Sequence, residues 1–150
     1  MDIKDYIILS DTTKTELANS VYRFTIPRNY YSNDRSSVCS VELQAVFINE
    51  NASHEVNYIS TNLGSRNQYY NNTGSVLGVL TNTKANEPAY TTTENMKLVT
   101  EARPQVIEIS FHRETDAKIE PVDFKLVLCF SYYNDETSAR TFNRQLYSEL

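Results

Sequence analysis

A strict alternation of side chains near the end of the chain constrains the fold more than any other feature. Between Val122 and Tyr132 every second residue is large and apolar, and most of the residues between them are polar or small. A period of two over this length is typical of a half-buried β-strand and unlike the 3.6-residue period of a helix. We therefore predict a long strand whose core-facing side holds Val122, Phe124, Leu126, Leu128, Phe130 and Tyr132.

A second strand is predicted just before it, at Gln105–Phe111, with a polar loop up to Pro121 between the two. Because the two strands are close in sequence, we expect them to be antiparallel neighbours in one sheet. The rest of the chain would then cover their apolar face.

Six further segments have the alternation or the β-rich composition of strands. They are expected at 21–26, 38–49, 56–60, 75–80, 89–92 and 97–100. In the segment 38–49, one face is expected to hold Cys39, Val41, Leu43, Ala45 and Phe47, opposite Ser40, Glu42 and Gln44. Residues 12–18 are interpreted as one helical turn.

About eight short strands separated by polar, turn-rich loops indicate an all-β fold. We predict an eight-stranded antiparallel jelly-roll sandwich with a single roll and short arms at both ends. The expected divisions are an N-terminal arm at 1–19, the roll at 20–133 and a C-terminal arm or short helix at 134–150. An immunoglobulin-like sandwich is the alternative, but it normally has a core tryptophan, and the sequence contains none.

Composition limits the kinds of partner. A chain of 150 residues suits one domain. Its formal charge of −5 disfavours a general nucleic-acid binder, which needs a basic surface for phosphates. The charged start, Met1–Tyr6, lacks the apolar core of a secretory signal, and no segment is apolar enough to span a membrane. We therefore expect no nucleic-acid binding, no membrane span, and synthesis in a cytoplasm or nucleus.

Residues that commonly carry chemistry are sparse and scattered. Cys39 and Cys129 lie inside predicted strands and are interpreted as buried free thiols, unless their strands are neighbours with disulfide geometry. His54 and His112 are expected at the surface rather than as metal ligands. The sequence has no Gly-rich phosphate loop and no nucleophile elbow. A pair of glycosidase carboxylates stays open, because spacing in three dimensions decides it. We expect no enzyme activity, no cofactor and no metal.

The order of these features resembles the jelly-roll capsid proteins of the double-jelly-roll virus lineage, which includes large eukaryotic DNA viruses, virophages and Polinton-like viruses. Three stretches carry the resemblance, and together they span most of residues 20–133: Phe24–Ile48, then Val56–Gly64 with Gly74–Leu80, then Tyr90 with Val106–Phe111 and Ile119–Phe130. The chain departs from the pattern in the glycine-free turn 114–118 and in the Asn- and Tyr-rich loop 61–74.

Length narrows what the resemblance implies. A chain of 150 residues has room for one roll, as in the penton protein that forms pentamers at icosahedral vertices. The resemblance therefore implies a structural protein of the virion, a homopentamer that contacts the major capsid protein and minor capsid proteins. The alternatives are a single-roll minor capsid protein and a carbohydrate- or receptor-binding β-sandwich.

Two sets of residues are the candidate sites. The assembly arms expected from the resemblance are Tyr6, Ile7, Ile8 and Leu9 near the start and Phe142, Leu146, Tyr147 and Leu150 near the end. The segment Tyr6–Leu9 could equally be an edge strand. The carbohydrate-binding alternative would use an exposed loop, because tyrosine rings stack on sugars and asparagine amides bind hydroxyls. This loop contains Arg66, Asn67, Tyr69, Tyr70, Asn71 and Asn72.

Overall fold

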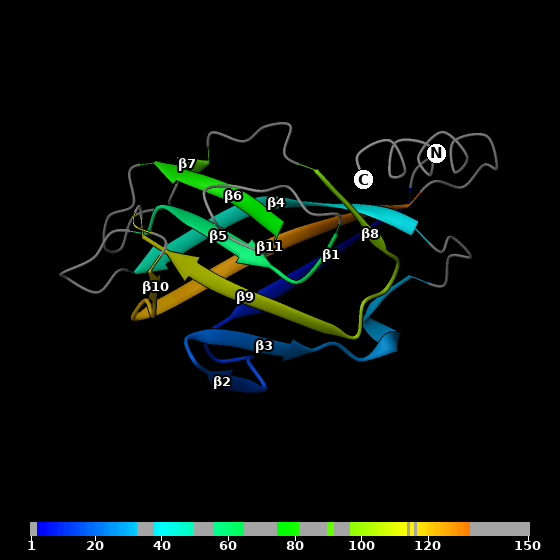
Figure 1. The fold of residues 1–150 in the computed structure, drawn as a ribbon. Coiled ribbons are helices and arrows are strands. Elements are labelled where there is room, and N and C mark those ends of the chain that lie inside the picture. Colours follow the sequence, from blue (N-terminus) through cyan, green and yellow to red (C-terminus); the bar gives the residue numbers. More distant parts are fainter. Residues whose placement is uncertain are drawn as a thin grey trace.

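The chain forms two antiparallel β-sheets that lie face to face, as seen in a computed structural model (Figure 1). The structure describes residues 3–32, 38–49, 56–64, 75–81, 90–91, 97–113, 115 and 117–132. Within these ranges the regular structure is β-strand, apart from one 3-10 turn at Arg28–Tyr30. The predicted all-β class is therefore confirmed at the level of an antiparallel β-sandwich.

The first sheet has four strands in the order β1-β11-β4-β8. Their bounds are β1 (Ile3–Ser10), β11 (Asp123–Tyr132), β4 (Val38–Asn49) and β8 (Leu98–Glu101). The second sheet has the order β2-β3-β9-β5-β6-β7, and β10 also pairs with β9. Its strands are β2 (Glu16–Ala18), β3 (Val21–Thr25), β9 (Val106–His112), β5 (Tyr58–Thr61), β6 (Ser75–Thr81), β7 (Tyr90–Thr91) and β10 (Lys118–Ile119).

The pairing of the longer strands is nested along the sequence. Among the described strands of four or more residues, the first pairs with the last, the second with the second-last, and so on inward. These pairs are β1 with β11, β3 with β9, β4 with β8, and β5 with β6, all antiparallel. The pairs β11–β4 and β9–β5 then join them into two sheets.

The strand predicted from strict alternation is confirmed as β11. Phe124, Leu126, Leu128 and Phe130 are buried, and the same face ends in buried Tyr132. Val122 is the exception, because it precedes the strand and is 62% exposed. Its backbone N–H donates to the carbonyl of Asn49 instead of continuing the regular register.

The predicted pairing of 105–111 with 122–132 is wrong. These segments are β9 and β11, and they belong to opposite sheets. They meet across the core, where the rings of Phe111 and Phe124 lie 4.8 Å apart between centroids. Both apolar faces are thus buried against each other, which satisfies the same hydrophobic pattern without a hairpin.

The predicted faces of 38–49 are correct only for its first half. The register of β4 against β11 shifts between Val127 and Leu128, so that Leu43 lies opposite Leu128 and Ala45 opposite Val127. One extra residue at this bulge exchanges the two faces of the strand. Beyond it Val46 and Ile48 are buried, while Ala45 is exposed and Phe47 is half-buried. The core positions beyond the bulge are therefore Val46 and Ile48 rather than Ala45 and Phe47.

Residues near the N-terminus belong to the sandwich. β1 pairs with β11 from Ile3 to Ser10, although residues up to 19 were predicted to form an arm. Residues 16–18 form β2 rather than a helical turn, because β2 and β3 make a tight hairpin. The two residues that join them, Asn19 and Ser20, have φ values of 54° and 61°, and positive φ at both positions is typical of a type I′ turn.

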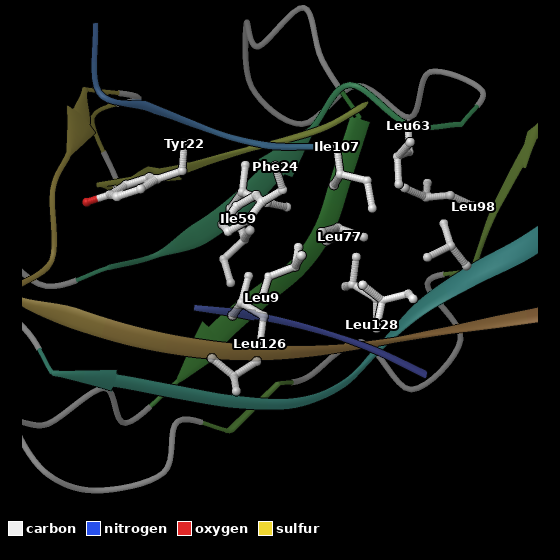
Figure 2. Packing of buried hydrophobic residues seen from close by; sticks show 14 of the residues in the cluster. Leu9, Tyr22, Phe24, Ile59, Leu63, Leu77, Leu98, Ile107, Leu126 and Leu128 are labelled. Carbon is white, nitrogen blue, oxygen red and sulfur yellow. The ribbon is translucent and has the colours of Figure 1, made fainter. Parts of the chain in front are cut away.

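The core lies between the two sheets and is built from both (Figure 2). Figure 2 shows Leu9 and Leu128 from the four-stranded sheet near side chains of the seven-stranded sheet, and Leu126 on β11 is also fully buried. Tyr22 adds edge-on ring contacts to Phe111 and Phe124, with centroids 5.7 and 4.7 Å away. Contacts of this kind stabilise beyond the area they bury.

The two cysteines are free and buried, as predicted. They lie on neighbouring strands, but Cys39 is opposite Tyr132 and Cys129 is opposite Glu42. This offset in register separates the two thiols along the strands, so the neighbouring strands do not bring them into disulfide geometry.

Candidate functional site

An apolar groove opens at one side of the sandwich, between the edge of one sheet and the edge of the other. β1 is the outermost described strand of the four-stranded sheet, and β2 with β3 forms the facing edge of the second (Figure 1). The groove has a volume of about 480 Å³. Its lining, which we call the edge groove, consists of Tyr6, Ile7, Ile8, Leu9, Thr13, Phe24, Thr25, Ile26, Pro27 and Tyr30.

Both faces of β1 carry apolar side chains where this strand lines the edge groove. Ile7 and Leu9 point inward and are 5% and 0% exposed, so they form part of the core. Tyr6 and Ile8 point outward and are 57% and 60% exposed. The outward positions of a solvated antiparallel strand are usually polar, so this edge strand departs from the ordinary pattern on its outer face.

The far wall of the groove comes from the segment that follows β3. Pro27 stops the strand because proline has no N–H for the ladder, and the 3-10 turn Arg28–Tyr30 follows. Tyr30 on this turn is 64% exposed. Of the five exposed large hydrophobic side chains among the described residues, three therefore gather at this groove.

Several contacts hold this wall against the sandwich. The hydroxyl of Tyr31 donates to the carbonyl oxygen of Pro104 at 2.6 Å, and the Tyr31 ring meets Phe130 edge-on at 5.9 Å. The backbone N–H of Ser32 donates to a carboxylate oxygen of Asp5 on β1 at 2.9 Å. Burial is the largest cause that raises the pKa of Tyr31 well above its usual value, so the Tyr31 hydroxyl stays protonated and can donate this hydrogen bond. The groove is therefore a fixed feature of the fold, since both walls are tied to the core.

The apolar surface continues from the groove onto the outer face of the four-stranded sheet. Ile8, Val127 and Ala45 lie side by side on β1, β11 and β4. Val127 is half-buried and Ala45 is exposed. The bulge in β4 creates this row, because it turns Ala45 outward. No side chain that lines the edge groove carries a formal charge, so the surface is suited to an apolar partner.

A second cluster lies on the outer face of the seven-stranded sheet. The Nε2 atom of His112 is 2.8 Å from the hydroxyl oxygen of Ser60 and 3.0 Å from that of Ser110, and the two hydroxyls also contact each other. The ring of Tyr58 stacks on the imidazole with centroids 4.5 Å apart. His112 is only 4% exposed, so its expected surface position is wrong.

In this cluster the serine hydroxyls contact a histidine, as a catalytic nucleophile contacts its base, but they are too buried for a substrate to reach them. A serine nucleophile needs a base within hydrogen-bond reach and room for the substrate carbonyl. Ser60 and Ser110 are 5% and 8% exposed, and both hydroxyls share one ring nitrogen. The arrangement satisfies buried polar groups, which is what a structural cluster requires.

The structure brings part of the predicted site together. Of the expected N-terminal arm residues, Tyr6 and Ile8 line the groove from outside, while Ile7 and Leu9 belong to the core. The expected C-terminal arm residues lie outside the described residues: Phe142, Leu146, Tyr147 and Leu150. So does the expected carbohydrate loop: Arg66, Asn67, Tyr69, Tyr70, Asn71 and Asn72. Sequence reasoning missed Tyr30, because its segment has only loop signals and its role depends on tertiary contact with β1.

Comparisons with known proteins add no relative. No protein-family model matches the chain, and neither a curated protein nor a solved structure is significantly similar to it. In the part of the chain that the structure describes, no helix is long and apolar enough to cross a bilayer. The same residues hold no group of three His, Cys, Asp or Glu side chains placed to bind a metal ion.

Proposed function

We propose that the chain is a single jelly roll that serves as a structural capsid protein, the vertex protein of a virion of the lineage it resembles. In this role five copies form a ring that contacts the major capsid protein and minor capsid proteins. The chain would act in the virion after synthesis in the cytoplasm or nucleus of a host. It would bind no cofactor and catalyse no reaction.

The nested strand pairing supports the jelly-roll part of the proposal. A jelly roll is an eight-stranded double sheet of two Greek keys, and it occurs in capsid and lectin domains. Pairing first with last and second with second-last is the order produced when one long antiparallel hairpin rolls up. The described strands of four or more residues pair in this order, with β1–β11 outermost and β5–β6 innermost.

The edge groove is the observation that carries the assembly part. Tyr6, Ile8 and Tyr30 are exposed together near β1, which pairs with only one other strand among the described residues. Natural monomers usually place charge or proline at such an edge as protection. An exposed apolar surface of this kind marks an interaction site. A ring uses a heterologous interface, in which one surface of each copy meets a different surface of the next. One apolar edge per copy is suited to that geometry.

A carbohydrate-binding module is the alternative that shares the fold. The loop on which it depends, residues 66–72, lies outside the described residues, and no described residue favours sugar binding over assembly. A minor capsid protein shares both fold and assembly and differs in the symmetry of its oligomer.

Negative-stain electron microscopy of the purified protein tests the proposal. We expect class averages of closed rings with five-fold symmetry. Rings or clusters of another symmetry would favour the minor capsid alternative. A uniform population of single chains at micromolar concentration would contradict the assembly role itself.

A further inference from the structure

No described residue covers the rim of the edge groove, although its floor is part of the core. Ile7, Leu9 and Phe24 at the floor are at most 5% exposed, whereas Tyr6, Ile8 and Tyr30 at the rim are more than half exposed. A cover for the rim would therefore come from residues outside the described ranges, of the same chain or of a second copy. This step rests on the proposed function, which supplies other copies of the same chain as the nearest neighbours.

The shape of the site favours an extended segment as the occupant. β1 pairs with β11 along one edge, and its other edge borders the groove in the described structure. An added strand can bond to such an edge through its backbone and insert alternate side chains into apolar pockets. Four consecutive residues of β1, Tyr6–Leu9, line the groove, whose volume is about 480 Å³, so it suits a short segment.

The sequence after β11 provides a segment of suitable chemistry. Residues 141–150 contain Phe142, Leu146, Tyr147 and Leu150 as apolar side chains. Their charged residues, Arg144 and Glu149, cancel, and the groove lining has no charge that would oppose an approaching neutral segment.

Length and starting point allow this segment to reach another copy. β11 ends at Tyr132, which lies opposite Ile3 at the start of β1. Residues 133–150 therefore begin at the end of the edge strand itself. Fully extended, a chain of this length spans roughly 60 Å, about twice the diameter of a small domain. We propose that the edge groove of one copy binds residues 141–150 of a second copy.

Disulfide trapping in the full-length protein tests this exchange. A chain that carries Ile8→Cys and Leu146→Cys places one thiol at the groove and one in the segment. Ile8 is 60% exposed, so its replacement leaves the core intact, and the natural thiols of Cys39 and Cys129 are buried and slow to react. Mild oxidation with oxidised glutathione, followed by non-reducing electrophoresis, then reports which thiols meet.

We expect a ladder of covalent dimers and higher oligomers. Docking should raise the local thiol concentration to the millimolar range, so cross-linking at micromolar protein should be about a thousandfold faster than for unbound chains. The matched control carries Val122→Cys and Leu146→Cys. Val122 is equally exposed, at 62%, but does not line the groove, so this control should give only the slow background.

The other results overturn either this inference or the proposed vertex role. A cross-link within single chains would show that the segment binds its own groove. Equal cross-linking in the Val122→Cys control, or none in the Ile8→Cys chain, would show no specific docking. If wild-type rings form without the ladder, this inference alone fails and assembly uses another surface. If the ladder forms without five-fold rings, the exchange holds and the vertex role fails.

Discussion

At the residue scale, the core-facing side of β11 makes a direct prediction. Leu128 is fully buried in the centre of the sandwich. Replacing it with alanine should lower the free energy of unfolding by about 2–5 kcal/mol, because the transfer energy is lost and a cavity is left. Urea denaturation measures this loss. Its neighbour Val127 faces outward and is half-buried, so Val127→Ala should cost about 1 kcal/mol or less. A loss below about 0.5 kcal/mol for Leu128→Ala would place that side chain outside the core.

Buried tyrosine and cysteine side chains predict sensitivity to alkali. Burial, as the largest cause, raises the pKa of Tyr22 to about 12 and that of Cys39 to about 12, and it also raises the pKa of Tyr31 and Tyr132. Above the unfolded values of 10.0 and 9.0, the unfolded chain loses these protons while the folded chain keeps them. The folded state is therefore stabilised less as the pH rises, and stability should fall between roughly pH 9 and pH 12.

Urea midpoints at pH 7 and at about pH 10.5 check this sign, because the unfolded groups titrate between these values. We expect a lower midpoint at the higher pH. A Tyr132→Phe variant keeps the ring but has no proton to lose, so its alkaline loss should be smaller. Equal midpoints of the wild type at both pH values would contradict the burial of these groups.

At the element scale, alternation predicts a strand but not its partner or its bulges. Apart from Val122, the bounds and buried face of β11 follow from its sequence, because a period of two with large apolar residues leaves little choice. The neighbour of β11 does not follow from its sequence. The apolar faces of β9 and β11 can be buried either side by side in one sheet or against each other from two sheets. The bulge in β4 depends on its register against β11, and the residues around Gln44 carry no local signal for it.

Gly64, in the turn after β5, is a position where the packing of one strand against another admits only glycine. Its φ is +81°, and an added Cβ would lie 2.8 Å from the Cβ of Leu98 and 3.2 Å from the carbonyl oxygen of Val99. Gly64→Ala should therefore cost roughly 2–4 kcal/mol, from left-handed backbone strain together with overpacking against β8. Urea or thermal unfolding measures it. A variant as stable as the wild type would mean that the turn after β5 relaxes freely.

At the scale of the whole molecule, the candidate site depends on elements far apart in sequence. Tyr6 and Ile8 stand out in the sequence as part of an apolar run near the N-terminus. The groove also needs Tyr30 and Pro27, whose position is fixed by Tyr31 and by the contact between Ser32 and Asp5. Such a site could be predicted only in part, because its second wall is created by tertiary packing.

An apolar free edge is a liability for a protein that works alone. Edge strands invite pairing with other chains, and most natural sheets protect them. Here the edge strand carries Tyr6 and Ile8 outward, next to the exposed Tyr30. The sandwich therefore has a well-packed interior and one side whose exposed apolar side chains are suited to a neighbouring chain.

Mass photometry of the wild type beside two variants shows whether copies of the chain assemble through the edge groove. We predict that the wild type has five times the mass of one chain, and that Tyr6→Ser with Ile8→Ser reduces it to the mass of one chain. Val122→Ser, an equally exposed apolar position outside the groove, should keep the wild-type mass. Assembly through the edge groove would be contradicted if the wild type had the mass of one chain. It would also be contradicted if the groove variant had the same mass as an oligomeric wild type.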